Sequence, residues 1–184
     1  MSKFTDNASE KLLVVAGKIS NQKHMASIKN AFYTLMPVIL TGAFCTLISN
    51  VVCSTTTTGI SLAKLPGMSW LGMFTDLFNA ANYATLNFFT VAAVFLIGME
   101  LAKQNGLGDS PDSGVVAVCS FISVLPTYVV TTVNDVQVTV PNVLGKDYTA
   151  ARGLFLGMVI ALVSVEIYSK FVKSHVFDFK MPDT

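Results

Sequence analysis

The stretch from residue 31 to residue 53 constrains this chain most, because it contains no charged side chain. At 1.5 Å of rise per residue, a helix of that length crosses the roughly 30 Å hydrocarbon core of a bilayer. We therefore expect it to span a membrane. Pro37 and Gly42 lie inside it and predict a bend, and a neighbouring helix must then satisfy the carbonyl that the bend frees.

The composition agrees with lipid as the solvent. Of the 184 residues, 52% are apolar and 12% are charged, and the mean hydropathy is +0.60. A soluble domain carries about 25% charged residues. The formal net charge of +1 is too small to hold a polyanion, which excludes nucleic acid as a partner. The expected fold class is an all-α membrane protein, because backbone groups in lipid are satisfied inside helices.

Three further stretches complete the expected set of about four transmembrane helices. Residues 83–99 and 114–130 are free of charge, and residues 153–171 carry charge only in their last turns. Pro126 predicts a kink in the second of these stretches.

Residues 65–81 are apolar but interrupted by Pro66 and Asp76. This pattern predicts an interfacial helix in which Trp70 lies at headgroup depth, since amphipathic rings favour that layer. The alternative is that the Trp70 ring stacks on a sugar.

Residues 129–133 and 136–140 are rich in β-branched side chains and flank the turn formers Asn134 and Asp135. This arrangement predicts a small β-hairpin outside the membrane.

The first 30 residues precede the first apolar stretch. Leu12, Val15 and Ile19 recur there at helical spacing among lysines. Residues 1–30 therefore predict an amphipathic helix, either in the headgroup layer of an anionic leaflet or packed in the cytoplasm. Lysines also gather in the tail, residues 172–184. Because basic segments stay on the cytoplasmic side, four spans with both termini in the cytoplasm satisfy the charge distribution.

Glu166 is the most informative single residue, since a carboxylate within a span is expensive and marks a functional site by default. Residues four apart share one helix face, so an ion pair between Glu166 and Lys170 is the structural alternative and the one we favour. An ion-coupled carrier that uses Glu166 is a further hypothesis. Glu100 and Lys103 form an analogous pair at a spacing of three.

Few other residues point to chemistry. Arg152 is expected to extend to the membrane surface, and His24 and His175 to lie solvated or against lipid in lysine-rich flanks. The three cysteines lack the spacing of a metal site and are expected to be reduced thiols in the core; they are Cys45, Cys53 and Cys119. The residues assemble no catalytic set, metal cluster or Walker loop, and no cofactor is expected.

Several polar residues of the second span are candidates for hydrogen bonds to a sugar or, in the reading we favour, between helices; they are Asn79, Asn82, Asn87 and Thr90. Glycines at regular places predict close helix packing, above all the motif that begins at Gly153 and ends at Gly157. The others are Gly42 and Gly98.

The order and spacing of several short segments resemble those of a known family. Residues 14–19 and 28–37 resemble the entry into the membrane of the enzyme IIC sugar permeases of the bacterial phosphotransferase system, in the branch for lactose, cellobiose and diacetylchitobiose. Residues 152–155 and 164–168 resemble a later span of that family, and residues 180–183 resemble the start of a longer signature.

This resemblance implies the N-terminal part of a permease in the bacterial cell membrane that moves a β-linked disaccharide inward while a phosphorylated IIB subunit phosphorylates it. It also implies a homodimer, with residues 31–171 as scaffold and dimerisation region. In such permeases the His and Glu that contact the sugar lie in the later half, so substrate-binding residues are not expected in this chain, which is not expected to be an enzyme on its own.

Overall fold

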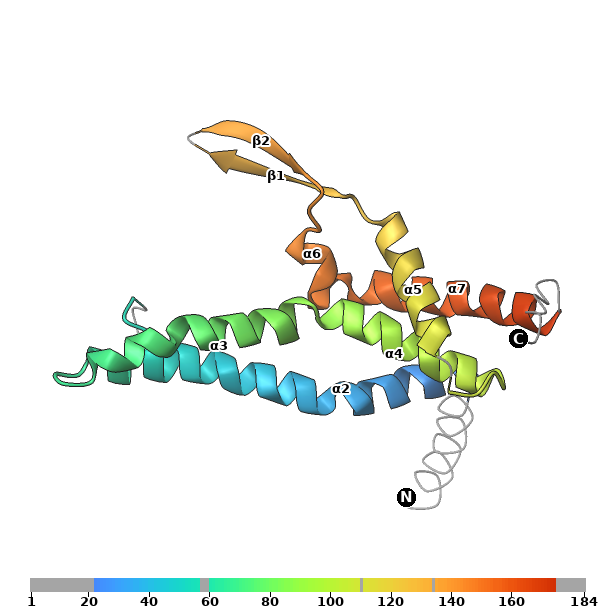
Figure 1. Ribbon diagram of the computed structural model, residues 1–184, viewed down its shortest axis with the longest axis horizontal. Coiled ribbons are helices and arrows are strands. Elements are labelled where there is room, and N and C mark those ends of the chain that lie inside the picture. The colour runs from blue at the N-terminus through green and yellow to red at the C-terminus, as the bar shows by residue number, and fades with distance from the viewer. Residues whose placement is uncertain (1–21, 57–59, 110, 134, 175–184) are drawn as a thin grey trace, which may run out of the picture.

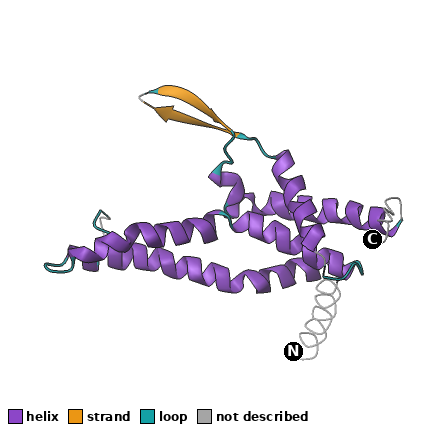
Figure 2. Cartoon of the chain, in the orientation of Figure 1, coloured by secondary structure: helices purple, strands orange, loops and turns teal. Residues whose placement is uncertain are grey.

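The computed structural model describes residues 22–56, 60–109, 111–133 and 135–174, and they are mostly helical (Figures 1 and 2). The long helices are α2 (Lys23–Leu47), α4 (Phe89–Gln104), α5 (Pro111–Val124) and α7 (Leu154–Lys173). The shorter helices and turns are η1 (Ile48–Cys53), η2 (Leu62–Lys64), η3 (Ser69–Phe74), α3 (Thr75–Asn82), η4 (Tyr83–Asn87), α6 (Lys146–Thr149) and η5 (Ala151–Gly153). The two strands are β1 (Tyr128–Val133) and β2 (Val136–Pro141).

Helix α2 confirms an apolar helix over residues 31–53 and corrects its start. It begins at Lys23, continues through η1, and forms one apolar helix of 31 residues, Lys23–Cys53, long enough to cross a membrane. The boundary that we expected between residues 30 and 31 is therefore not a helix end. Pro37 lies inside α2 without interrupting it. The rest of the expected amphipathic leader, residues 1–21, lies outside the described residues.

The expected interfacial helix and second span form one broken helix. The helical segment Ser69–Asn87 is followed at Phe88 by a bend of 43°, after which α4 continues to Gln104. Phe88 has left the helical region, with φ −103° and ψ 14°. The expected boundary between this segment and the second span was thus wrong, because α3 continues directly into η4 while packing along α2 (Figure 1).

Helix α5 differs from the predicted third span. It covers Pro111–Val124, which at 14 residues is shorter than the spans on either side. Pro126 follows the end of the helix and does not kink it, because a proline disfavours helical geometry in the residue before it. By length and composition, two helices of the described residues qualify as membrane spans, or three if the broken pair counts as one.

The hairpin is confirmed. Strands β1 and β2 pair antiparallel from Tyr128 opposite Pro141 to Val133 opposite Val136. Asp135, with φ of 61°, lies in the two-residue turn, where a left-handed residue matches the twist of the strands. The hairpin projects away from the helices (Figure 1), and nearly all its side chains are exposed.

Helix α4 is the centre of the fold, packing against α2, α5 and α7 (Figure 1). The largest fully buried side chains of this core include Leu35, Val94, Ile97, Leu101, Phe121 and Val165. Away from the core, large apolar side chains face outward. Phe44 on α2 is 63% exposed and Phe155 on α7 is 74% exposed. Exposed apolar helix faces of this kind fit a surrounding of acyl chains.

Close approach at glycines holds these helices together, as predicted for Gly98 and Gly157, whereas Gly153 meets the backbone of Tyr148 in α6 instead of a facing long helix. A Cβ added at Gly157 would lie 2.6 Å from Val94 Cγ2, and one added at Gly98 would lie 3.0 Å from the carbonyl oxygen of Ser113. At Gly153 the nearest atom would be the backbone oxygen of Tyr148, at 1.9 Å. Small residues thus set the separation between α4, α5 and α7.

The contact at Gly153 predicts a stability effect. Gly153→Ala forces backbone to move, so we expect a loss of about 1–3 kcal/mol in the free energy of unfolding, the usual range for overpacking. Gly145→Ala is the matched control, because its new methyl would meet only ordinary contacts at 3.4 Å or more. The measurement is the thermal unfolding midpoint in detergent. Equal midpoints for the two variants would contradict the packing at Gly153.

Candidate functional site

Glu166 lies in a polar cluster where the start of α2 meets the second half of α7. Its carboxylate forms an ion pair with Lys23 Nζ, and His24 Nε2 lies 3.6 Å from Glu166 Oε1. The side chain of Glu166 is 24% exposed and that of Lys23 is 44% exposed. The expected pair between Glu166 and Lys170 was therefore wrong, because a partner from another helix takes the carboxylate.

Asn105, at the end of α4, links the same two helices. Lys23 Nζ donates to Asn105 Oδ1 at 3.0 Å, and Asn105 Nδ2 donates to Ser169 Oγ at 3.1 Å. Gly106 follows with φ of 80°, and the N–H of Leu107 reaches back to the carbonyl of Ala102 at 3.0 Å. This is a glycine-ended helix of the Schellman type, which fixes the backbone that carries Asn105.

We name this cluster of Lys23, His24, Asn105, Glu166 and Ser169 the polar clasp. It joins α2, α4 and α7 at one end of the molecule. Lys23 on α2 binds both Glu166 on α7 and Asn105 at the end of α4. These contacts between helices favour a helix-packing role for Glu166 over a substrate or proton role. The sequence signal that was available, Asn105 before a glycine, predicted only a turn.

Glu100 and Lys103 also found partners other than each other. Asn30 Nδ2 on α2 donates to Glu100 Oε2 at 3.2 Å, while Lys103 Nζ lies 3.0 Å from Asp109 Oδ1. The expected pair at a spacing of three was wrong for the same reason as above, since groups outside the helix offered shorter contacts.

Two of the candidate asparagines connect α3 to α2 and η1. Ser49 Oγ donates to Asn79 Oδ1 at 2.6 Å, and Asn82 Nδ2 donates to Thr46 Oγ1. Thr90 Oγ1 on α4 donates to the carbonyl of Ala150 at 2.5 Å. These polar side chains are used between segments of the chain, as the helix-packing reading predicted.

The remaining candidates are dispersed. Arg152 pairs with Asp147 at 3.1 Å and stays exposed in η5, before the start of α7 and away from the polar clasp on its second half. Cys53 is buried as expected, whereas Cys119 is exposed, so the prediction of a core position was wrong for Cys119. All three cysteines are free thiols.

Within the described ranges no group of His, Cys, Asp and Glu is placed to hold a metal ion. His175 lies outside those ranges.

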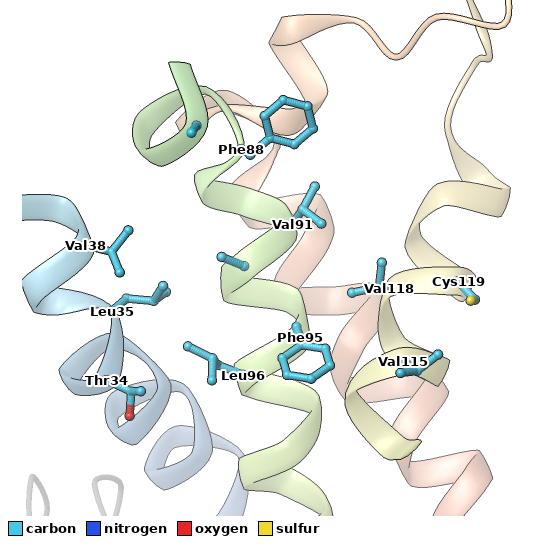
Figure 3. A pocket seen from close by; sticks show the side chains of 12 residues that line it. Thr34, Leu35, Val38, Phe88, Val91, Phe95, Leu96, Val115, Val118 and Cys119 are labelled. Atoms are coloured by element: carbon cyan, nitrogen blue, oxygen red, sulfur yellow. The ribbon is translucent and has the colours of Figure 1, made fainter. Parts of the chain in front are cut away.

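An apolar groove of about 630 Å³ lies over α4, with α2 on one side and α5 on the other (Figure 3). We name it the α4 groove. Its lining comprises Thr34, Leu35, Val38, Ala84, Phe88, Val91, Ala92, Phe95, Leu96, Val115, Val118 and Cys119. The hydroxyl of Thr34 is already bonded to the carbonyl of Asn30 at 3.2 Å. The groove thus offers apolar contact without the hydrogen-bonding groups that a sugar requires.

Comparison of the sequence with known protein families identifies the family of this chain. The sequence model described as "Phosphotransferase system, EIIC" matches residues 29–184. The chain belongs to the phosphotransferase system EIIC family.

Curated relatives of this EIIC chain agree. It is 28% identical over 177 residues to the oligo-beta-mannoside-specific EIIC component of Bacillus subtilis, covering 96% of this chain and 37% of that protein. It is 29% identical to the lichenan permease IIC component of the same organism, covering 100% and 39%. Against the cellobiose-specific EIIC component of Geobacillus stearothermophilus the identity is 25%, with the same coverage.

A solved structure shares the fold of the EIIC chain. It is the crystal structure of the transporter ChbC, the IIC component of an N,N'-diacetylchitobiose-specific phosphotransferase system, with a TM-score of 0.75 at 26% identity. The match covers 95% of this chain and 39% of that one. The chain therefore spans about two fifths of the length of the relatives that it matches.

The polar clasp predicts different effects for two lysines of this EIIC chain. Lys23→Gln leaves Glu166 without its cation, so we expect a loss of roughly 1–3 kcal/mol in the free energy of unfolding, between the values for exposed and buried pairs. Lys170→Gln removes the same charge four residues from Glu166 and is the matched control, with little expected change. The measurement is thermal unfolding in detergent.

A charge exchange tests the same contact independently. The double variant Lys23→Glu with Glu166→Lys restores opposite charges and should recover part of the stability that Lys23→Glu alone loses. A loss for Lys170→Gln as large as for Lys23→Gln, or no recovery in the double variant, would contradict the assignment of the pair.

Proposed function

We propose that this chain is the N-terminal membrane part of a IIC permease that carries a β-linked disaccharide across the bacterial cell membrane, coupled to its phosphorylation by a phosphorylated IIB subunit. The observation that carries the proposal is the family match over residues 29–184 together with the fold of a diacetylchitobiose IIC transporter. The relatives named for β-mannosides, lichenan and cellobiose support a β-linked sugar as the substrate class.

In this proposal the chain supplies scaffold, and it is not an enzyme on its own. The α4 groove is apolar, and two of the candidate asparagines, Asn79 and Asn82, are bonded to other segments of the chain. The groups that contact the sugar and the phosphorylation point then belong to the remaining part of the permease, as the family resemblance implies. Residues 31–171 form the scaffold, residues 172–184 the cytoplasmic tail and residues 1–30 the cytoplasmic leader.

Both termini lie in the cytoplasm in this proposal. Support comes from the contact between Lys23 and Glu166, which puts the start of α2 and the second half of α7 at one end of the molecule. The hairpin lies away from that end (Figure 1). Lysines concentrate at the end with the polar clasp and beyond it in the chain, which is the pattern of a cytoplasmic side.

A second candidate function is a membrane module that dimerises and anchors without contributing to transport. The open α4 groove favours it, because an apolar recess of this size can receive a helix of a second copy. A homodimer belongs to both candidates, so the oligomeric state alone does not separate them.

Uptake separates the two candidates. The chain is co-expressed with the remaining part of a cellobiose-type permease and with its IIA and IIB proteins, in cells without their own cellobiose permease. We expect phosphorylated cellobiose to accumulate when both permease parts are present and to fall to background without this chain. Uptake that persists without the chain would contradict the transport proposal and favour the anchoring module.

The purified chain supplies the control. Titration calorimetry with cellobiose should give no heat of binding for the chain alone, because the described residues offer no polar recess for a sugar. Heat that saturates with cellobiose would contradict the placement of the sugar site in the other part of the permease.

A further inference from the structure

Two adjoining hollows follow the outer side of α7 toward its C-terminal end. The first, of about 370 Å³, lies between α7 and the start of α2, and the second, of about 290 Å³, lies at the last turns of α7. Both are lined by Ile167, so they adjoin each other. We name them together the α7 groove. Its α7 lining consists of Leu162, Val163, Glu166, Ile167, Lys170, Phe171 and Ser174, and His24 closes its inner end.

The floor of the α7 groove is apolar and faces outward. Ile167 and Phe171 are each 51% exposed, and Val163 is 55% exposed. These side chains lie four residues apart and therefore form one continuous ridge on the helix. They belong to the segment Ala151–Lys173, which is long and apolar enough to cross a membrane. A lipid chain is the occupant that such a floor fits.

The outer end of the groove is cationic. Lys170 lines it, and Lys173 stands in the last turn of α7. Among the residues that the structure describes, the ion pairs use other cations, namely Lys23, His24, Lys103 and Arg152. The carboxylate in the groove, Glu166, is neutralised by Lys23.

The helix dipole does not cancel this charge. The carbonyls at the end of α7 carry about half a negative charge, against two full positive charges on the lysines. The N–H of Ser174 and its hydroxyl also bond to carbonyls of the last turn, such as that of Phe171. The end of the groove therefore keeps a net positive charge, which complements an anion.

We propose that the α7 groove binds one anionic phospholipid, with its phosphate at Lys170 and Lys173 and an acyl chain along Ile167 and Phe171. A free anion would use the lysines but leave the apolar ridge uncovered, and a zwitterionic lipid would gain less from two unopposed lysines. The inference goes beyond transport, because it requires only that the chain lies in a membrane.

Native mass spectrometry of the full chain in detergent tests the proposal. The probes are phosphatidylglycerol and phosphatidylcholine with identical acyl chains. We expect the unmodified chain to retain phosphatidylglycerol in preference to phosphatidylcholine. The double variant Lys170→Gln with Lys173→Gln should weaken phosphatidylglycerol binding by roughly fivefold for each lysine and remove the preference.

Lys146→Gln is the matched control, since Lys146 is an exposed lysine in α6, next to the hairpin and far from the α7 groove (Figure 1). It should leave the preference unchanged. Lys170→Arg with Lys173→Arg keeps both charges and should also keep the preference, which separates loss of charge from loss of folding. An equal loss in Lys146→Gln, or an unchanged preference in the double Gln variant, would overturn the proposal.

The apolar ridge and the source of the phosphate are tested separately. Ile167→Asn should weaken retention of both lipids, because it interrupts the floor of the groove. Inorganic phosphate, added at constant ionic strength, should not displace bound phosphatidylglycerol. Displacement by phosphate would show an anion site without a lipid, and lipid retention that Ile167→Asn leaves unaltered would show that the acyl chain does not lie on this ridge. Either result would overturn the proposal.

Discussion

The close approach of α4 to its neighbours supports the rest of the structure. In lipid the hydrophobic effect does not press helices together, so contact depends on dispersion and therefore on short distances. Gly98 and Gly157 make those distances possible, because a Cβ at either position would overlap the facing helix. The buried residues of α4, such as Val94 and Ile97, can then fill the space between α2, α5 and α7. Exposed apolar side chains on the outer faces complete a fold that is packed inside and lipid-like outside.

Polar side chains fasten this packing at its two extremes. At one end the polar clasp joins α2, α4 and α7 through Lys23, Asn105 and Glu166. Toward the other end of α2 and in η1, the broken helix is held by a hydrogen bond that Asn82 donates to Thr46 and one that Ser49 donates to Asn79. In each case the alternative is a polar group left in an apolar surrounding, so the bonds fix which helices are neighbours as well as adding stability.

This use of the polar residues bears on function. Residues that attract attention in the sequence, above all Glu166 and the asparagines near α3, are engaged within the chain. The α4 groove is apolar. In the function proposed above, such a chain supplies a membrane scaffold, and in the proposed lipid site its α7 groove faces lipid.

The sequence alone was enough to predict a lipid surrounding, the mainly helical fold, the hairpin and the close packing at glycines. These features follow from local properties: absence of charge, β-branched side chains around a turn, and residues without a side chain. Tertiary structure decided the rest. It joined two expected elements into one helix bent at Phe88, and paired Glu166 with Lys23 instead of Lys170. Spacing along one helix reports only the neighbours on that helix. The half-buried carboxylate of Glu166 takes the cation that packing brings closest, and that cation lies far away in the sequence.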